Sequence, residues 1–224
     1  MSKKKKYGDF LEHYFTNNPN LKSELRTIIY KTRGHEFTFY SDNGVFSKDK
    51  IDYGSNLLLD TLFTYKKLND GEPKKALDVG CGYGLIGISV AKILDYEVTM
   101  CDVNDRALHL AQKNAQLNKA NVQIINSDTY KNIDGKFDLI ITNPPIRAGK
   151  SVVYKILDDA QKYLSDDGEL WCVIRKNQGA KSTKEHLENY YDCEIVTKNK
   201  GFYIIKAQKK TKKSWQETLH HIQL

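Results

Sequence analysis

The sequence predicts an α/β fold built on a mostly parallel seven-stranded sheet that ends in an antiparallel hairpin, with a small hairpin and helix in front of it. From Lys75 onward, short apolar runs alternate with longer segments of helical character, which is typical of a parallel sheet covered by helices. The last two apolar runs, 194–197 and 202–207, are joined by only four residues. Because a link that short cannot cross a sheet, these two strands must pair antiparallel.

The amino-terminal part predicts a β-hairpin followed by a helix. The chain before His35 is polar and mixed, and the run 35–40 alternates apolar with polar side chains, which predicts a strand. The turn signal Asp42-Asn43-Gly44 then leads into Val45-Phe46-Ser47 as the returning strand. Ser55 is the expected cap of an apolar helix over 56–63.

The core is expected to alternate strand and helix up to the final hairpin. The remaining strands are predicted near 75–79, 97–101, 122–126, 137–142 and 169–174, and the helices near 84–94, 105–118, 152–164 and 180–190. Asp105 stands at a good cap position for the second helix, and Asp166-Asp167-Gly168 predicts a turn before the strand at 169. We divide the chain into an extension, a core and a basic tail, over 1–70, 71–208 and 209–224.

Composition excludes several classes of protein. The longest apolar runs fall well short of the roughly 18 residues that a membrane span needs. Met1-Ser2 and the four lysines that follow lead into no apolar segment, so they do not form a secretory signal. The four cysteines lie far apart, which is typical of reduced thiols in a cytoplasmic protein. No spacing of histidines or cysteines indicates a metal site, and the oligomeric state cannot be derived from the sequence.

The net charge of +7 is concentrated at the two ends of the chain. Four lysines occupy 3–6, and five more crowd the stretch 206–213. Such a surplus fits a polyanionic partner such as RNA. Composition alone equally fits lysine-rich ends that are merely solvated.

A glycine-rich corner lies between the first core strand and an apolar helix. It reads Asp78-Val-Gly80-Cys81-Gly82-Tyr-Gly84, and its glycines let the backbone approach a ligand while the helix end offers free N–H groups. Asp102 ends the next strand, the usual position for binding ribose hydroxyls. Gly82, Gly84 and Gly87 also match the spacing of a dinucleotide-binding pattern, which keeps a dehydrogenase open as an alternative.

A rigid hinge follows the fourth core strand. Asn143-Pro144-Pro145 stands where that strand ends, and two prolines fix the backbone there. The Asn143 side-chain carbonyl and the Pro144 backbone carbonyl then form two fixed acceptors, which suit the two hydrogens of an exocyclic NH₂ group. Holding both hydrogens turns the nitrogen lone pair toward an incoming methyl group, so that positioning and dipoles do the catalysis without a strong base. The alternative is a simple proline-capped loop.

The corner resembles the first motif of class I S-adenosylmethionine-dependent methyltransferases, which have a Rossmann-like α/β fold. Together with the runs Gly44–Leu59 and Asn143–Gly149, it resembles the bacterial enzymes that methylate guanine N2 in 16S ribosomal RNA, over about residues 10 to 208. The match is to the catalytic half of those two-domain enzymes. The resemblance implies S-adenosylmethionine as methyl donor, a guanine amino group as acceptor, and ribosomal RNA or the small ribosomal subunit as partner.

The resemblance also implies roles for individual residues. Those around the methionine part of the cofactor are Asp78, Gly80, Cys81, Gly82 and Gly84. The rest of the implied cofactor site consists of Asp102 with Val103 at the ribose, Ser127 with Asp128 at the adenine, Asn143, and Phe46 and Ser55 as a cover. The implied catalytic residues are Asn143, Pro144 and Pro145, and the implied substrate-binding residues are Ile146, Arg147 and Lys150.

The sequence departs from the family pattern after the hinge. Ile146 replaces the aromatic residue that usually stacks on the flipped base, and Arg147 stands where histidine is frequent. The second domain of the larger enzymes has no counterpart here, so the lysine-rich ends or a partner would supply the RNA contact. Three alternatives stay open: methylation of another amino group such as protein glutamine or adenine, a non-catalytic RNA-binding module, and the dehydrogenase.

Overall fold

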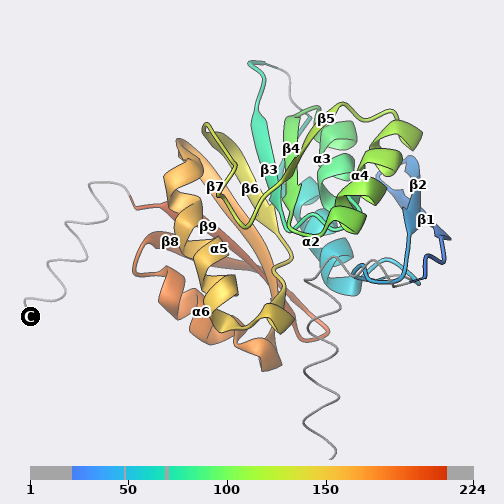
Figure 1. The fold of residues 1–224 in the computed structure, drawn as a ribbon. Coiled ribbons are helices and arrows are strands. Elements are labelled where there is room, and N and C mark those ends of the chain that lie inside the picture. Colours follow the sequence, from blue (N-terminus) through green and yellow to red (C-terminus); the bar gives the residue numbers. More distant parts are fainter. Residues whose placement is uncertain (1–21, 48, 69–70, 211–224) are drawn as a thin grey trace, which may run out of the picture.

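The computed structural model describes residues 22–47, 49–68 and 71–210, and it shows the expected α/β architecture (Figure 1). A seven-stranded sheet has the order β5-β4-β3-β6-β7-β9-β8, and β1 and β2 form a separate two-stranded sheet. The strands are β1 (Arg26–Thr32), β2 (His35–Ser41), β3 (Lys75–Val79), β4 (Glu97–Asp102), β5 (Val122–Asn126), β6 (Phe137–Thr142), β7 (Leu164–Arg175), β8 (Tyr191–Asn199) and β9 (Phe202–Lys209). The helices are α2 (Tyr53–Tyr65), α3 (Leu85–Leu94), α4 (Asp105–Leu117), α5 (Lys150–Tyr163) and α6 (Ala180–Leu187), with 3₁₀ turns η1 (Ile146–Ala148) and η2 (Lys176–Gln178).

The sheet is parallel from β5 through β7 and antiparallel at β9 and β8, as the sequence predicts. Helices α2, α3 and α4 cover one face, and α5 and α6 cover the other (Figure 1). Alternate residues of the central strands therefore enter different cores: Leu139 and Ile141 pack with α2 and α3, and Ile140 packs with α5. A strand that is buried on both faces reads as a continuous apolar run, which is why the central strands are visible in the sequence.

Strand order reverses between β3 and β6, because the chain runs outward from β3 to β5 and then returns to the other side of β3. Such a reversal opens a crevice at the carboxyl ends of the strands, where α/β proteins bind ligands. Asp78 is paired with Ile141 of β6 and with Met100 of β4. The glycine corner, the end of β4 and the hinge after β6 therefore meet at one edge of the sheet.

The amino-terminal hairpin forms, but its predicted pairing is wrong. β2 pairs with the preceding strand β1, through the two-residue turn Arg33-Gly34, and not with 45–47, which lies in a loop. Both turn residues have positive φ, 47° and 77°, as a tight two-residue hairpin requires. Arginine is disfavoured there, but its guanidinium donates to the Asp60 carbonyl (3.1 Å) and to Thr64 Oγ1 (2.7 Å). Those contacts with α2 are not visible in the local sequence.

Two predicted caps and one predicted turn also differ from the structure. Asp52, not Ser55, caps α2, because its carboxylate accepts from the Ser55 N–H. Asn104, not Asp105, caps α4 by accepting from the Ala107 N–H. The stretch 166–168 lies within β7 as a bulge, where the pairing jumps from Phe137–Leu164 to Leu139–Glu169. A bulge and a turn share the same glycine and aspartate signals, so the sequence does not separate them.

The hairpin is attached to α4 by two asparagines that imitate a neighbouring strand. Asn118 accepts from the Thr38 N–H (3.0 Å) and donates to the Thr38 carbonyl (2.8 Å). Asn114 does the same at Tyr40 (2.7 and 2.9 Å) and also donates to the Tyr83 carbonyl in the glycine corner (2.8 Å). These bonds satisfy the backbone N–H and carbonyl groups of Thr38 and Tyr40 at the outer edge of β2. Through Asn114 they also connect the hairpin to the glycine corner.

Several predictions fall outside the described residues. These are the basic stretches 3–6 and 212–213, and the boundary placed at residue 70, so they stay predictions. Within the part of the chain that the structure describes, no helix combines the length and the apolar character that crossing a bilayer requires.

Candidate active site

The glycine corner is held open by backbone geometry. Gly80, Gly82 and Gly84 have φ values of 75°, 55° and 94°, which side-chain-bearing residues rarely adopt. The Cys101 carbonyl accepts from the Gly80 and Cys81 N–H groups (2.9 and 3.0 Å), so the corner is fixed to the end of β4. A Cβ atom built on Gly80 or Gly82 would meet no atom within 4 Å. The backbone therefore borders space that a ligand can enter.

Gly87 lets α3 press against β4 behind this corner. A Cβ atom there would overlap Met100 Sδ and Cγ. The Gly87 N–H donates to Asp78 Oδ2 (2.8 Å), which ties the first turn of α3 to β3. The amino end of α3 and its partial positive charge consequently lie at the site. Gly87, which fits the dinucleotide pattern, thus has a packing role.

Asp78 is a buried carboxylate, and one of its two oxygens has no hydrogen-bond partner in the described residues. Its side chain is 1% exposed, and Asp78 Oδ1 has no hydrogen-bond partner among the described residues. Burial raises the pKa of Asp78 to about 7; the Gly87 N–H opposes this and the charge of Asp102 adds to it. A buried oxygen without a partner is costly. The arrangement suits a ligand that brings a hydrogen-bond donor or a positive charge.

Asp102 ends β4 as predicted and lies beside the corner. Its Oδ2 accepts from the Gly82 N–H (2.9 Å), and its Oδ1 accepts from the Asn104 N–H (3.0 Å). Burial raises the pKa of Asp102, while the backbone N–H groups of Asn104, Gly82 and Val103 oppose that rise. A carboxylate has about four lone-pair sites, so with these three N–H donors Asp102 can still accept from a ligand hydroxyl. Val103 follows it and is half-buried.

The loop after β5 contains Ser127 and Asp128, two predicted cofactor residues, of which only Asp128 is exposed to a ligand. Ser127 is buried, and its hydroxyl donates to the Thr129 carbonyl and accepts from the Asn132 N–H, both at 3.0 Å. That hydroxyl therefore shapes the loop. Asp128 is exposed, with its carboxylate 3.7 Å from Lys155 Nζ.

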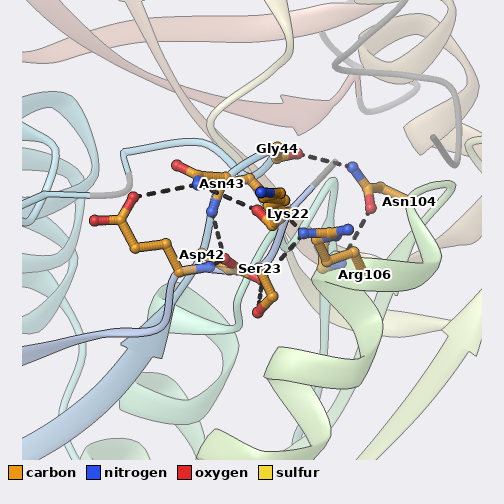
Figure 2. Close-up of polar contacts among 9 residues, drawn as sticks. Lys22, Ser23, Asp42, Asn43, Gly44, Asn104 and Arg106 are labelled. Carbon is orange, nitrogen blue, oxygen red and sulfur yellow. Dashed lines mark hydrogen bonds and ion pairs between the residues drawn. The ribbon is translucent and has the colours of Figure 1, made fainter. Parts of the chain in front are cut away.

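The loop 42–47 carries Phe46 and is held by α4 (Figure 2). Arg106 donates to the Asp42 carboxylate (3.1 Å) and to the Asn43 carbonyl (3.3 Å), and Asn104 Nδ2 donates to the Gly44 carbonyl (3.1 Å). Because Asn104 also bonds to Asp102, it links this loop to the end of β4. Phe46 is 44% exposed. Asn104 is not among the residues predicted from the sequence, although its place two residues after Asp102 and before a helix is a capping signal.

The Asn-Pro-Pro hinge is an inverse γ-turn at the end of β6. Thr142 Oγ1 donates to the Val79 carbonyl (2.8 Å), which joins the ends of β6 and β3. Pro145 has φ −74° and ψ 80°, and the Ile146 N–H donates to the Pro144 carbonyl (2.8 Å). The turn fixes the direction of the Pro144 carbonyl and uses one of its two lone pairs. One lone pair remains for a ligand.

The Asn143 side chain is oriented by α2. Its Nδ2 donates to Ser55 Oγ (2.8 Å) and to Asp52 Oδ2 (3.1 Å). A carboxylate can only accept, so the amide nitrogen must face α2 and the carbonyl oxygen must face away. No described residue donates to Asn143 Oδ1, which leaves it as an acceptor beside the glycine corner.

Asp52 is a second residue of the candidate site, after Asn104, that was not predicted from the sequence. It caps α2 through the Ser55 N–H (2.9 Å) and with the same oxygen orients Asn143. The local signal was present, since Asp52 precedes the first helical residue. Its second role joins positions 91 residues apart and requires the fold.

The predicted substrate residues follow the hinge directly. Ile146 lies in η1, half-buried against the α5 side of the core, and Arg147 and Lys150 are exposed. Lys150 Nζ lies 4.8 Å from the ring centroid of Tyr154. An apolar surface and two cations therefore stand beside the two acceptors.

Cysteines and potential metal-ligating side chains also occur among the described residues. All four cysteines are unpaired, and burial raises the pKa of Cys81 well above its usual range, so its thiol stays neutral. Within 22–47, 49–68 and 71–210, no group of three His, Cys, Asp or Glu side chains is placed to hold a metal ion.

The sheet order, the glycine corner and the Asn-Pro-Pro hinge define a class I S-adenosylmethionine-dependent methyltransferase. The model of the methyltransferase small domain family matches residues 36–206. The chain belongs to that family.

Known proteins with similar sequences or structures support this assignment, and they differ in identity and in the share of each chain that is matched. YbxB of Bacillus subtilis, an uncharacterized protein, is 47% identical over 203 residues, which cover 88% of this chain and 98% of YbxB. Ribosomal RNA small subunit methyltransferase C of Haemophilus influenzae is 37% identical over 165 residues, 70% of this chain and 48% of that enzyme. The T. thermophilus 16S rRNA N2 G1207 methyltransferase RsmC, solved with AdoMet and guanosine, superimposes with a TM-score of 0.76 at 25% identity, over 86% of this chain and 52% of that one. The chain thus spans about half the length of these two methyltransferases.

The cofactor is S-adenosylmethionine, and the residues present fit it. Gly80 and Gly82 border open space, Asp78 has an unpartnered oxygen, and Asp102 stands at the adjacent strand end. The dinucleotide interpretation of Gly82, Gly84 and Gly87 is therefore wrong.

Proposed function

We propose that this chain methylates the exocyclic N2 amine of a guanine in 16S ribosomal RNA. The observation that carries the proposal is the orientation of Asn143, whose amide nitrogen is bound by Asp52 and Ser55 while its carbonyl oxygen is left as an acceptor. The relatives named for small-subunit ribosomal RNA methylation support the choice of substrate.

The two acceptors orient the amine. Asn143 Oδ1 accepts one N–H of the guanine amine, and the remaining lone pair of the Pro144 carbonyl accepts the other. Both oxygens are held before substrate arrives, Asn143 by α2 and Pro144 by its γ-turn. The amine lone pair is thereby turned toward the cofactor, and no energy is spent on reorganising these dipoles during the reaction.

Bound S-adenosylmethionine supplies an electrophilic methyl group. The N–C bond forms as the S–C bond breaks, and the amine proton, which becomes acidic only as the new bond forms, leaves to water. Asn143 and Pro144 stabilise the positive charge that develops on the amine nitrogen, because both present the negative end of a carbonyl dipole.

The cofactor contacts follow the sheet edge. The methionine part would lie along Asp78, Gly80, Cys81, Gly82 and Gly84. Asp102 and Val103 would bind the ribose, and Asp128 would accept from the adenine amine, with the Ser127 loop beneath it. Phe46 would cover the cofactor from loop 42–47, whereas the Ser55 hydroxyl serves Asn143. Ile146 would pack on the target base, and Arg147 and Lys150 would contact the RNA.

The test is methyl transfer to 16S ribosomal RNA, with the product located by mass spectrometry. Asn143→Ala should lower kcat by about 100-fold, since it removes one fixed acceptor, and should leave S-adenosylmethionine binding in place. Asn189→Ala, at an exposed asparagine after α6, is the matched control and should retain full activity.

Parallel reactions with release factor and with DNA test the other amino-group acceptors. Transfer to a protein glutamine or to adenine, with none to RNA guanine, would refute the proposed substrate. Undiminished transfer by Asn143→Ala would refute the role of the hinge.

A further inference from the structure

Four cations gather at the site edge of the sheet, outside the residues already discussed. They are Arg175 at the end of β7, Lys176 after it, and Lys198 and Lys200 around the β8–β9 turn; we call them the basic turn surface. β7 runs parallel to β6, so Arg175 lies at the same edge as Asn143. Arg175 pairs with Phe202 at the start of β9, and the Lys176 N–H donates to the Gly201 carbonyl (2.8 Å). Figure 1 shows this turn at the end of the sheet where α2 lies.

A short series of contacts connects this surface to the hinge. Lys200 Nζ lies 5.0 Å from the ring centroid of Tyr53, the first residue of α2. The preceding residue, Asp52, bonds to Asn143. The turn also packs tightly on α2, because a Cβ atom on Gly54 would come within 2.9 Å of Phe202 Cε1. The turn that carries these cations is therefore held at a fixed position relative to the acceptors.

Aromatic rings orient the cationic side chains. Arg175 Cζ lies 4.4 Å from the Phe202 ring centroid, and Lys198 Nζ lies 5.2 Å from that of Tyr203. The negative face of each ring attracts the cation that lies over it. All four cations are nevertheless exposed. Arg175, Lys198 and Lys200, which lie over rings, can therefore bind an anion with less loss of side-chain freedom than unconstrained side chains.

These charges are not neutralised by the described part of the chain. Arg175, Lys176, Lys198 and Lys200 form no ion pair with any described carboxylate. The lysines further along β9 differ: Lys206 lies 3.8 Å from Glu169 and Lys209 lies 4.0 Å from Asp166. These four uncompensated charges thus lie at the same edge of the sheet as the hinge, although the sequence places much of the basic surplus at the chain ends.

We propose that the basic turn surface binds backbone phosphates of the RNA strand that carries the target guanine. The inference rests on the proposed function. Clustered cations next to a site for an uncharged base complement the phosphates that flank the base, and such contacts position a strand without reading its sequence. The surface would present the guanine to Asn143 and Pro144 while taking no part in the reaction.

The test compares two double variants of the full chain with the same loss of charge. Lys198→Gln with Lys200→Gln removes two cations from the surface. Lys74→Gln with Lys75→Gln removes two exposed cations from the opposite edge, at the start of β3. Binding of in vitro transcribed 16S RNA is measured between about 50 and 300 mM KCl. The turn variant should reduce the slope of log affinity against log salt by about 1.5, and the control should leave it unchanged.

Kinetics distinguish docking from chemistry. The turn variant should raise KM for RNA by about tenfold at the lower salt concentrations. Its kcat at saturating RNA and its affinity for S-adenosylmethionine should stay as in the wild type, which also shows that the variant is folded.

Three outcomes overturn the inference. An unchanged salt slope together with normal RNA methylation overturns the surface and leaves the proposed function standing. If the turn variant loses activity on the assembled subunit but keeps full activity on naked RNA, the surface binds a ribosomal protein and not RNA. Absence of RNA binding and RNA methylation by the wild type overturns the inference and the proposed function together.

Discussion

At the scale of single residues, the proposed mechanism requires that the oxygen of the Asn143 amide, and not its nitrogen, be left as an acceptor. The two ends of the Asn143 carboxamide differ only in being donor or acceptor, and Asp52 and Ser55 select the orientation by bonding to its nitrogen. Both partners come from the first turn of α2, so helix capping and the orientation of the Asn143 amide share one carboxylate.

Asp52→Asn tests this selection without removing the cap. Asparagine caps helices about as well as aspartate, but its NH₂ group can turn toward Asn143 and compete for the orientation of that amide. We expect kcat to fall by about 10- to 100-fold, with little change in melting temperature or in S-adenosylmethionine affinity. Asp60→Asn, which changes a bond within the same helix to Asn56, is the control and should retain kcat. Equal activity of both variants would contradict the role of Asp52.

Asp78 makes stability depend on pH. Its folded pKa of about 7 lies above its ordinary value of 3.8, so between these values the folded state binds more protons than the unfolded state. The free energy of unfolding must then decrease as pH rises through this window and level off above the folded pKa. Asp78→Asn should remove this decrease.

The measurement is urea unfolding without cofactor at about pH 5 and about pH 8. At the higher pH, Asp78→Asn should be more stable than the wild type by roughly 1–4 kcal/mol, and it should bind S-adenosylmethionine more weakly. Parallel pH profiles for the two proteins would refute the shifted pKa.

At the scale of elements, α4 connects the amino-terminal hairpin to the glycine corner. Asn118 bonds only to the hairpin and to its own helix, whereas Asn114 bonds to the hairpin and to the Tyr83 carbonyl between Gly82 and Gly84. The two asparagines lie one helical turn apart and differ mainly in this third contact.

Asn114→Ala and Asn118→Ala form a matched pair. Each leaves the N–H and carbonyl of one β2 residue unsatisfied, so each should lower the free energy of unfolding by about 1–3 kcal/mol. Asn114→Ala should in addition weaken S-adenosylmethionine binding, measured by calorimetry. Equal cofactor affinities in the two variants would show that the hairpin is not coupled to the corner.

At the scale of the whole molecule, the reversal of strand order brings three separate segments to one edge of the sheet. The glycine corner after β3, Asp102 at the end of β4 and the hinge after β6 are distant in the chain, yet the pairing of β3 with both β4 and β6 fixes them as neighbours. Helices on both faces bury the central strands, so the edge is rigid.

Binding of the cofactor to this edge should stabilise the entire fold by mass action. At a concentration 100 times its Kd, S-adenosylmethionine should add about 2.7 kcal/mol to the free energy of unfolding, which thermal unfolding detects as a rise in melting temperature. NADH should produce no rise, and Asp102→Ala should reduce the rise with S-adenosylmethionine. A stabilisation by NADH of the same size would contradict the assignment.

Local chemistry made much of the fold and the centre of the site predictable. Glycines between a strand and a helix, and two prolines after a strand, act on the backbone of their own segment, so their consequences can be derived from neighbouring residues. The strand partner of β2 could not be predicted in this way, because arginine is disfavoured at the Arg33 turn position and the contacts that hold it come from Asp60 and Thr64 on α2. The Asp166-Asp167-Gly168 bulge could not be distinguished from a turn for the same reason, because it is defined by pairing with β6, a separate segment of the chain.

The sequence by itself determined the α/β class, the glycine corner, the strand-end Asp102 and the Asn-Pro-Pro hinge, because each follows from short-range backbone preferences and apolar periodicity. Only the tertiary structure decided that Asp52 orients Asn143, that Asn114 ties the hairpin to the corner, and that Lys200 lies over Tyr53, which follows Asp52. These pairs are distant in the chain, and they meet because burial of both faces of the sheet fixes where each strand ends.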